Sequence, residues 1–305
     1  MSGTVFLGTS EFAAAILERL AAREEHRPLL VITRPDRPAG RGRQLSSPPV
    51  AETARALGLV LAQPQSVNDE VARQAIASFG RGRGEPATVI VCAFGALIKE
   101  PLLSQQPILN VHPSLLPRWR GAAPVERAIM AGDTRTGVSI MRLTEGLDSG
   151  PVCLSESLAL EARDTYGSLA ARLEELGAKL LLRALDESPA FVEQASEGVT
   201  YAEKIGPADR TLDPDASALE LERTVRALTP HIGARLELAD GSLLGVLDAL
   251  AHTEVEASGR GLYARDGRLL LGCSAGELEL LEVQPAGGRP MDGPAYLRGH
   301  GVGVW

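Results

Sequence analysis

The sequence predicts an α/β domain built on a parallel sheet, followed by a smaller domain of short antiparallel strands. Apolar runs at residues 4–7 and 29–32 flank a segment of helical periodicity, and this strand–helix–strand order is typical of a parallel sheet with a right-handed crossover. Residues 88–93 form a continuous run rich in β-branched side chains, the pattern of a central strand in a parallel sheet. After residue 233, short alternating segments separated by turns favour antiparallel strands. A chain of 305 residues is long enough for two domains with cores of their own.

The elements of the first domain follow from local patterns. Ser10 or Thr9 is placed to cap the first helix. Further helices are expected over residues 51–57, 67–79, 124–130 and 165–185, and further strands over residues 59–61, 108–112, 138–143 and 152–158. Residues 33–49 hold four prolines and two glycines and are expected to form a long functional loop. No Gly-x-Gly-x-x-Gly pattern follows the first strand, which disfavours a dinucleotide site.

The second domain begins after a stretch with little periodicity. We place the first domain at residues 1–188, a linker at residues 189–206 and the second domain at residues 207–305. A helix is expected over residues 216–228, and strands over residues 234–238, 243–250, 261–264, 268–272 and 277–283. Short strands joined by turns such as Ala239-Asp240-Gly241 indicate a small antiparallel barrel.

Composition is that of an ordinary globular protein, with 44% hydrophobic and 23% charged residues. The three cysteines (Cys92, Cys153 and Cys273) lie far apart, and no Cys-x-x-Cys or His-x-x-x-His spacing occurs, so no metal site is expected. Scattered cysteines fit a reducing cytosol. The sequence shows neither a secretory leader nor an apolar run long enough to span a bilayer, so we expect a cytoplasmic protein with no membrane partner.

The net charge of −8 argues against a general nucleic-acid-binding protein. The loop at residues 33–49 is a local exception. It carries Arg34, Arg37, Arg41 and Arg43, opposed only by Asp36. Such a patch can bind a few phosphates without holding every nucleic acid.

A polar pair ends one of the predicted strands. Asn110 and His112 alternate with Val111, so their side chains lie on the same face of that strand. Pro113 keeps His112 in an extended conformation. Open α/β sheets bind their ligands at the carboxyl ends of strands, which makes this pair a candidate site.

A third polar residue completes the candidate site. Asp148 lies in the turn Glu145-Gly146-Leu147-Asp148-Ser149-Gly150-Pro151, between two apolar runs. Histidine is the acid or base tuned nearest to neutral pH, aspartate can orient it, and asparagine can donate to a developing oxyanion. These three residue types together can handle the chemistry of a carbonyl group. A lone Asn or His at a strand end is more often only a hydrogen-bonding cap, and Asp148 is the reason to prefer a site.

These motifs resemble those of the folate-dependent formyltransferases. The resemblance rests on Asn110-Val111-His112, Ser114-Leu115-Leu116-Pro117, Arg120-Gly121-Ala122-Ala123-Pro124 and Gly146-Leu147-Asp148-Ser149-Gly150. Residues 6–13 and 33–43 resemble the members that act on aminoacylated tRNA. Further similarity at residues 201–205 and 284–287 extends the resemblance over nearly the whole chain.

The resemblance implies a Rossmann-like catalytic domain that binds folate, followed by an OB-like β-barrel domain that contacts tRNA. It implies direct transfer of the formyl group of 10-formyltetrahydrofolate to the α-amino group of methionyl-initiator tRNA, giving formylmethionyl-tRNA for translation initiation, without a metal. The implied catalytic residues are Asn110, His112 and Asp148. The implied folate-binding residues are Ser114, Leu115, Leu116 and Pro117, and the implied tRNA contacts are Arg37, Arg41 and Arg43, with Arg41 at the acceptor end. We expect a monomer.

Three alternatives stay open at the level of sequence. The chain could formylate a small amine such as glycinamide ribonucleotide or an amino-sugar nucleotide, although Glu11 stands where a phosphate loop would favour glycine. It could hydrolyse the formyl donor, or it could bind folate or tRNA without catalysis. The chain departs from the family pattern at residues 231–234, which lack the expected aromatic side chains. We therefore carry over no barrel contact from the family to this segment.

Overall fold

The computed structural model describes residues 3–39, 44–81, 86–257 and 259–300. The chain divides into two compact units, and each unit is made of segments that are separate in the sequence. Unit 1 takes the chain up to Pro124, together with Thr136–Leu158 and Ala170–Ala202. Unit 2 takes Val125–Arg135, Ala159–Leu169 and the chain from Glu203. In the described ranges we find no helix both apolar enough and long enough to cross a membrane.

The first sheet lies in unit 1 and is mostly parallel. Its strand order is β10-β9-β7-β6-β1-β2-β5. The strands are β1 (Thr4–Gly8), β2 (Pro28–Ile32), β5 (Leu61–Ala62), β6 (Thr88–Cys92), β7 (Ile108–His112), β9 (Arg135–Arg142) and β10 (Val152–Ala159). The strands from β7 to β5 run parallel, and β9 runs antiparallel to β7. The predicted α/β class is confirmed, with an antiparallel edge added.

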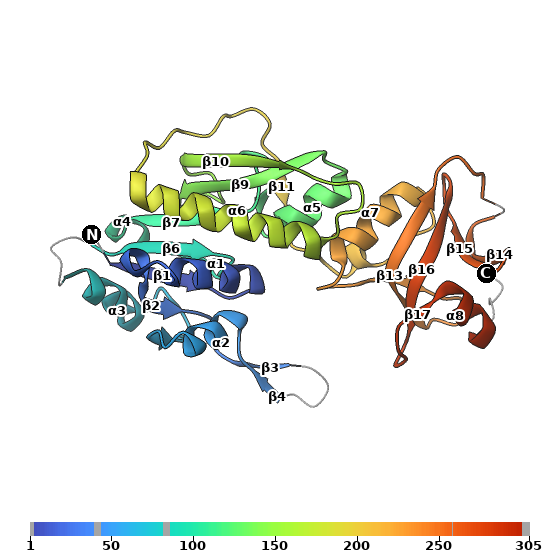
Figure 1. Ribbon diagram of the computed structural model, residues 1–305, viewed down its shortest axis with the longest axis horizontal. Coiled ribbons are helices and arrows are strands. Elements are labelled where there is room, and N and C mark those ends of the chain that lie inside the picture. Colours follow the sequence, from blue (N-terminus) through green and yellow to red (C-terminus); the bar gives the residue numbers. More distant parts are fainter. Residues whose placement is uncertain (1–2, 40–43, 82–85, 258, 301–305) are drawn as a thin grey trace. The chain divides into compact units, whose positions relative to one another are not determined.

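Helices cover both faces of this sheet (Figure 1). On one face lie α1 (Glu11–Ala21) and α6 (Tyr166–Glu187), and α2 (Pro49–Ala56) packs against α1. The helices α3 (Glu70–Arg81) and α4 (Leu102–Gln105) contribute to the core on the other face. Ser10 is the N-cap of α1, and its Oγ accepts a hydrogen bond from the Ala13 amide at 3.3 Å. Gly177 allows close packing, because a Cβ there would lie 3.1 Å from Val111 and 3.2 Å from Ile16.

Glu174 of α6 is half-buried, and this makes stability depend on pH. Burial raises the pKa of its carboxyl from 4.5 to about 6, and the Arg19 guanidinium opposes the rise. Because the folded-state pKa lies above the unfolded one, Glu174 favours the fold below pH 4.5, and this contribution is lost as the pH rises through 6. We therefore expect Glu174→Gln to gain stability relative to the parent between these pH values. The gain should level off above pH 7 at about 1 kcal/mol, after allowance for solvent screening.

Urea unfolding of both proteins at pH 4.5, 6 and 7.5 measures this effect. The exposed neighbour Glu175, changed to Gln, is the matched control and should give a difference that does not vary with pH. A Glu174→Gln difference that is equally flat would contradict the prediction.

The proline-rich stretch after β2 contains a short hairpin that the sequence did not predict. β3 (Arg37–Ala39) pairs antiparallel with β4 (Gln44–Ser46). Asp36 anchors its base by accepting hydrogen bonds from Gln63 Nε2 at 2.6 Å and Ser47 Oγ at 3.0 Å. The pairing escaped prediction because it depends on backbone groups and this anchor rather than on an apolar pattern.

Unit 2 contains the second sheet, which is antiparallel as predicted. Its order is β12-β13-β16-β15-β14, with β17 paired to β16. The strands are β12 (Ala234–Glu237), β13 (Leu243–His252), β14 (Gly261–Arg265), β15 (Arg268–Gly272), β16 (Glu277–Pro285) and β17 (Met291–Asp292). Its helices include α5 (Pro124–Ala131), α7 (Ala218–Leu228) and α8 (Gly293–His300). Ser217 and Glu220 form a capping box at the start of α7. The sequence did not predict β17 and α8.

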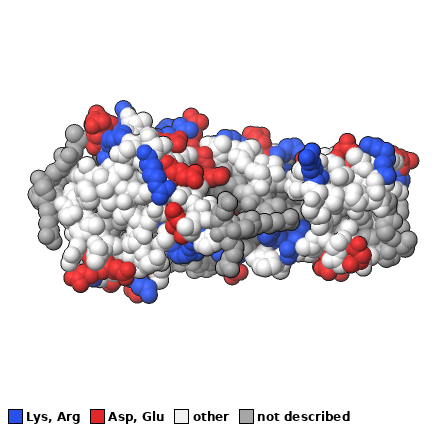
Figure 2. All heavy atoms as spheres, turned by 90° about the horizontal axis from the view of Figure 1, so that it is seen from below, with Lys and Arg blue, Asp and Glu red and all other residues white. Residues whose placement is uncertain are grey.

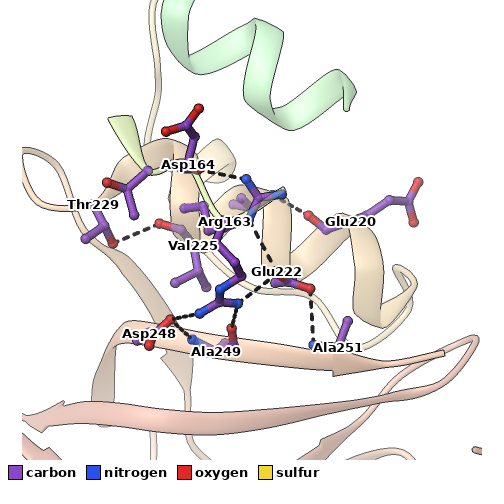
Figure 3. Close-up of polar contacts among 12 residues, drawn as sticks. Arg163, Asp164, Glu220, Glu222, Val225, Thr229, Asp248, Ala249 and Ala251 are labelled. Atoms are coloured by element: carbon purple, nitrogen blue, oxygen red, sulfur yellow. Dashed lines mark hydrogen bonds and ion pairs between the residues drawn. The ribbon is translucent and has the colours of Figure 1, made fainter. Parts of the chain in front are cut away.

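An ionic network joins the segment Ala159–Leu169 to the rest of unit 2 (Figure 3). Arg163 contacts Glu222 Oε1 at 3.0 Å and Asp248 Oδ1 at 2.7 Å. Arg226 donates to the Asp164 carbonyl at 2.8 Å, and its Nε lies 3.4 Å from Glu222 Oε1. Glu222 and Arg226 are both only 7% exposed, so this pair is shielded from water, whereas Arg163 and Asp248 are half-exposed.

His231, in the segment that departs from the family pattern, has partners within unit 2. Its ring stacks on Tyr166 with the centroids 3.5 Å apart, and its Nε2 lies 3.0 Å from Glu126 Oε1. A stacked ring and a carboxylate thus surround this histidine.

Candidate active site

The predicted pair lies at the carboxyl end of β7, inside unit 1. Asn110 is 8% exposed and His112 is 4% exposed. β7 sits between β6 and β9, and His112 is paired in register with Ser139 of β9. Buried polar side chains must be satisfied by partners, so their contacts define what the site can do.

Asp148 meets both members of this pair. Asn110 Nδ2 donates to Asp148 Oδ1 at 3.4 Å, and His112 Nδ1 lies 3.7 Å from Asp148 Oδ2. The Gly121 amide donates to the same Oδ2 at 2.8 Å. Asp148 has a φ of +42°, a left-handed backbone conformation that is uncommon for a residue with a side chain. The turn thus places the Asp148 carboxylate at the end of β7.

The ring of His112 is fixed from its other side. His112 Nε2 lies 2.8 Å from the Trp119 carbonyl. A carbonyl oxygen only accepts, so Nε2 carries the proton and donates. Nδ1 then faces Asp148 across 3.7 Å, too far for a direct hydrogen bond, and the two groups form an ion pair only when Nδ1 is also protonated. This arrangement leaves Nδ1 able to take up and release a proton.

The segment Ser114-Leu115-Leu116-Pro117 forms a turn directly after β7. Ser114 is fully buried, and its Oγ donates to the Arg118 carbonyl at 2.6 Å. Ser139 Oγ donates to the Ser114 carbonyl at 2.8 Å and accepts from the Leu116 amide at 3.2 Å. The Ser114 hydroxyl is therefore used within the turn, whereas Leu115, Leu116 and Pro117 are half-buried.

Residues from the predicted linker also reach the site, and the sequence did not indicate them. β8 (Arg120–Gly121) pairs in parallel with β11 (Tyr201–Ala202). Thr200 Oγ1 accepts from the Trp119 amide at 2.9 Å. Gln194 donates to the Asp148 carbonyl at 2.8 Å. No sequence signal could have found these contacts, because most of them involve backbone atoms.

The arginines predicted to contact tRNA are only partly described. Arg37 is exposed on β3, whereas Arg41 and Arg43 lie outside the described residues. Arg34 turns back, and its Nη1 donates to the Gly95 carbonyl at 3.0 Å. On the face drawn in Figure 2, cationic and acidic side chains are interspersed rather than gathered into one field.

A separate cavity of about 360 Å³ lies in unit 1, at the amino ends of the strands. Its lining includes Thr4 and Thr88, the first residues of β1 and β6, and the pair His26–Asp186. None of the predicted site residues lines it. Ligand sites in such sheets lie at the opposite, carboxyl ends, so the Asp148 turn stays the candidate site in preference to this cavity.

None of the three cysteines is placed as an activated nucleophile, since each thiol is desolvated by burial. Burial raises the pKa of Cys92 and of Cys153, and it raises the pKa of Cys273 to about 11. Thiols with raised pKa values stay protonated at neutral pH and are poor nucleophiles. Asn110, His112 and Asp148 therefore stay the candidate catalytic residues.

Two family models match nearly the whole chain. The model described as formyl transferase matches residues 3–185, and the formyl transferase C-terminal domain matches residues 204–301. The methionyl-tRNA formyltransferase of Dechloromonas aromatica is 39% identical over 303 residues, which is 98% of this chain and 96% of that one. The chain belongs to the methionyl-tRNA formyltransferase family. As a formyltransferase it is an enzyme, and the two matches leave residues 186–203 between them.

Solved structures share the fold of this formyltransferase. HypX from Aquifex aeolicus in complex with tetrahydrofolic acid has a TM-score of 0.61 at 16% identity. The match covers 97% of this chain and 47% of HypX, so the formyltransferase spans about half the length of that protein. WlaRD, a sugar 3N-formyl transferase in the presence of dTDP and 5-N-formyl-THF, has a TM-score of 0.65 at 14% identity and covers 92% of this chain and 97% of WlaRD. Folate derivatives thus occur with proteins of this fold.

Proposed function

We propose that this formyltransferase moves the formyl group of 10-formyltetrahydrofolate directly to the α-amino group of methionyl-initiator tRNA. The observation that carries the proposal is the meeting of Asn110, His112 and Asp148 at the end of β7. The full-length similarity to a methionyl-tRNA formyltransferase supports the choice of acceptor over a small amine. The product would be formylmethionyl-tRNA for translation initiation.

Each of the three residues has a distinct chemical role in this proposal. As the amine nitrogen bonds to the formyl carbon, negative charge develops on the formyl oxygen. The Asn110 amide has two N–H bonds and gives one to Asp148, so the other can donate to that oxygen. His112 Nδ1 accepts the proton that the attacking amine must lose. Asp148 orients the ring and stabilises its positive charge.

Direct transfer needs no covalent enzyme intermediate. An α-amino group titrates near 8, so roughly a tenth of it is a free base at neutral pH. The bond to the folate nitrogen breaks as that nitrogen gains a proton, which His112 can return. The electron pair of the broken bond stays on the folate nitrogen, so one N–C bond forms for each one that breaks.

The formyl donor would lie against the turn that follows β7. Leu115, Leu116 and Pro117 offer half-buried apolar surface, which suits a flat ring system. Ser114 would act through the turn itself, since its hydroxyl is already bonded to Arg118. We assign folate binding to residues 1–188, with residues 207–305 as the domain that contacts tRNA.

An acceptor panel tests the proposed function. The protein is incubated with 10-formyltetrahydrofolate and either charged initiator tRNA, charged elongator tRNA, glycinamide ribonucleotide or an amino-sugar nucleotide. We expect formylmethionine on the initiator tRNA and little product elsewhere. Faster transfer to a small amine, release of free formate without an acceptor, or no turnover would each reject the proposal in favour of one alternative.

The loop at residues 33–49 gives a prediction about how well the enzyme uses tRNA as its substrate. Replacing Arg41 by Leu should lower kcat/KM for charged tRNA by roughly 10- to 100-fold, the effect of losing a charged hydrogen bond. The log–log salt slope of tRNA binding should flatten by about 0.7–0.9 for each phosphate that the variant no longer neutralises. Affinity for folate should not change.

Arg23→Leu is the matched control, because Arg23 is an exposed arginine in the same unit but outside the loop. Filter binding at several salt concentrations and initial rates measure both variants. If Arg41→Leu behaves like Arg23→Leu, the loop is only a solvated surface feature.

A further inference from the structure

The segment of residues 192–202, here called the strap, is fastened beside the candidate active site at both ends. Val192 and Val152 exchange two backbone hydrogen bonds of 2.8 and 2.9 Å. At the other end the Arg120 amide donates to the Thr200 carbonyl at 2.9 Å, and the Ala122 amide donates to the Ala202 carbonyl at 2.8 Å. The strap therefore runs past the Asp148 turn as a held segment of unit 1.

Gln194 lies between these fastenings and uses its whole amide. Its Nε2 donates to the Asp148 carbonyl at 2.8 Å and to the Gly150 carbonyl at 2.7 Å. Its Oε1 accepts from Arg120 Nε at 3.0 Å and from Arg120 Nη2 at 2.8 Å. A side-chain amide has two N–H donors and one oxygen with two lone pairs, so every position is filled.

These contacts are made to the Asp148 turn, the part of the site with an unfavourable backbone conformation. The Asp148 backbone is in a left-handed conformation, which costs roughly 1 kcal/mol and persists only where the surroundings impose it. Gln194 imposes it by bonding the carbonyls on both sides of Ser149. Its oxygen also holds Arg120, the neighbour of the Gly121 amide that binds the Asp148 carboxylate. Gln194 thus helps to position both partners of the hydrogen bond between the Gly121 amide and the Asp148 carboxylate.

We propose that Gln194 is a positioning residue, which holds the Asp148 carboxylate against His112 and the Gly121 amide for formyl transfer. This inference rests on the proposed function. Gln194 lies in the segment between the two family matches and acts on the site through the Asp148 turn and Arg120. A shift of about 1 Å in a catalytic group can lower the rate by about 100-fold.

Three variants separate positioning from simple attachment of the strap. Gln194→Ala removes all four hydrogen bonds, and kcat should fall roughly 10- to 100-fold while the KM values for folate and tRNA stay within about threefold. Gln194→Glu keeps a strong partner for Arg120 but faces the two carbonyls with an oxygen instead of N–H groups. It should be no better than Gln194→Ala. Glu193→Ala, an exposed neighbour, is the control and should match the parent.

The energetic coupling between Gln194 and Asp148 distinguishes a positioning role from a merely structural one. In an Asp148→Ala background, Gln194→Ala should cause no further loss of kcat, because its effect passes through that carboxylate. Amide hydrogen exchange should show about tenfold less protection of Gly121 in Gln194→Ala, with β7 unchanged.

These experiments distinguish failure of the positioning role from failure of the proposed function. Rescue by Gln194→Glu, additive losses with Asp148→Ala, or unchanged protection of the Gly121 amide would overturn the positioning role. If the parent protein itself transfers no formyl group, the proposed function fails. The exchange measurement still tests whether Gln194 holds the turn, so the two failures are distinct.

Discussion

Replacing His112 by Ala is expected to lower kcat for formyl transfer by roughly 10²–10⁴-fold, with the fold retained. The reason is the geometry at the end of β7. His112 Nε2 donates to the Trp119 carbonyl, so Nδ1 is the nitrogen left to move protons beside Asp148. Asp148→Asn should give a loss in the same range, because it removes the charge that stabilises the protonated ring. Single-turnover rates at saturating substrate measure the chemical step without product release.

The double variant tests whether the two residues act as a unit. His112→Ala with Asp148→Asn should lose little more than the worse single variant. His26→Ala is the matched control, since His26 pairs with Asp186 at the other end of the sheet in the same unit. It should keep kcat within about twofold. Near-normal turnover in a folded His112→Ala protein would remove this histidine from the mechanism.

The sheet and its polar edge could be predicted because they leave local patterns. β6 is a short, mostly apolar run and β7 begins with one, and the alternation of Asn110, Val111 and His112 fixes which side chains share a face. The glycines and proline around Asp148 likewise predicted a turn. The structure brings these three residues together, and their catalytic roles stay predictions.

The strap could not be predicted, because its contacts follow no periodicity. Gln194 bonds two carbonyls, and Thr200 and Ala202 act largely through their backbones. Any residue type offers such groups, so only tertiary placement reveals them. The hairpin of β3 and β4 was missed for the same reason, and α8 was missed because few of its residues are apolar and buried.

The division into two units likewise depends on contacts that leave no local pattern in the sequence. The segment Ala159–Leu169 precedes most of α6 in the chain, yet it packs with unit 2 through Arg163 and Asp164. These are polar contacts between residues about sixty positions apart, which a local pattern cannot reveal. A chain cut after residue 188 would leave Arg163 without both of its carboxylate partners, Glu222 and Asp248.

Glu222 is the centre of that network, and its removal should have the largest effect on stability. It contacts Arg163 and Arg226, and its Oε2 accepts from the Ala251 amide at 3.2 Å (Figure 3). Desolvation already lowers the pKa of Arg226, and Glu222 opposes that effect. Without Glu222, Arg226, a residue that is 7% exposed, would lose its counter-charge. Breaking a buried ion pair from one side costs roughly 3–5 kcal/mol.

We therefore expect Glu222→Ala to destabilise unit 2 by about 3–5 kcal/mol. Arg163→Ala is the control for the half-exposed part of the network and should cost about 1 kcal/mol or less. Glu222→Leu combined with Arg226→Leu should recover at least about half of the loss, because no buried charge then stays unpaired. Amide hydrogen exchange in α7 and β13 reports on unit 2 alone, which avoids assuming that both units unfold together. If Glu222→Ala costs no more than Arg163→Ala, or if the double variant is the least stable of the three, the network does not hold unit 2 together through this carboxylate.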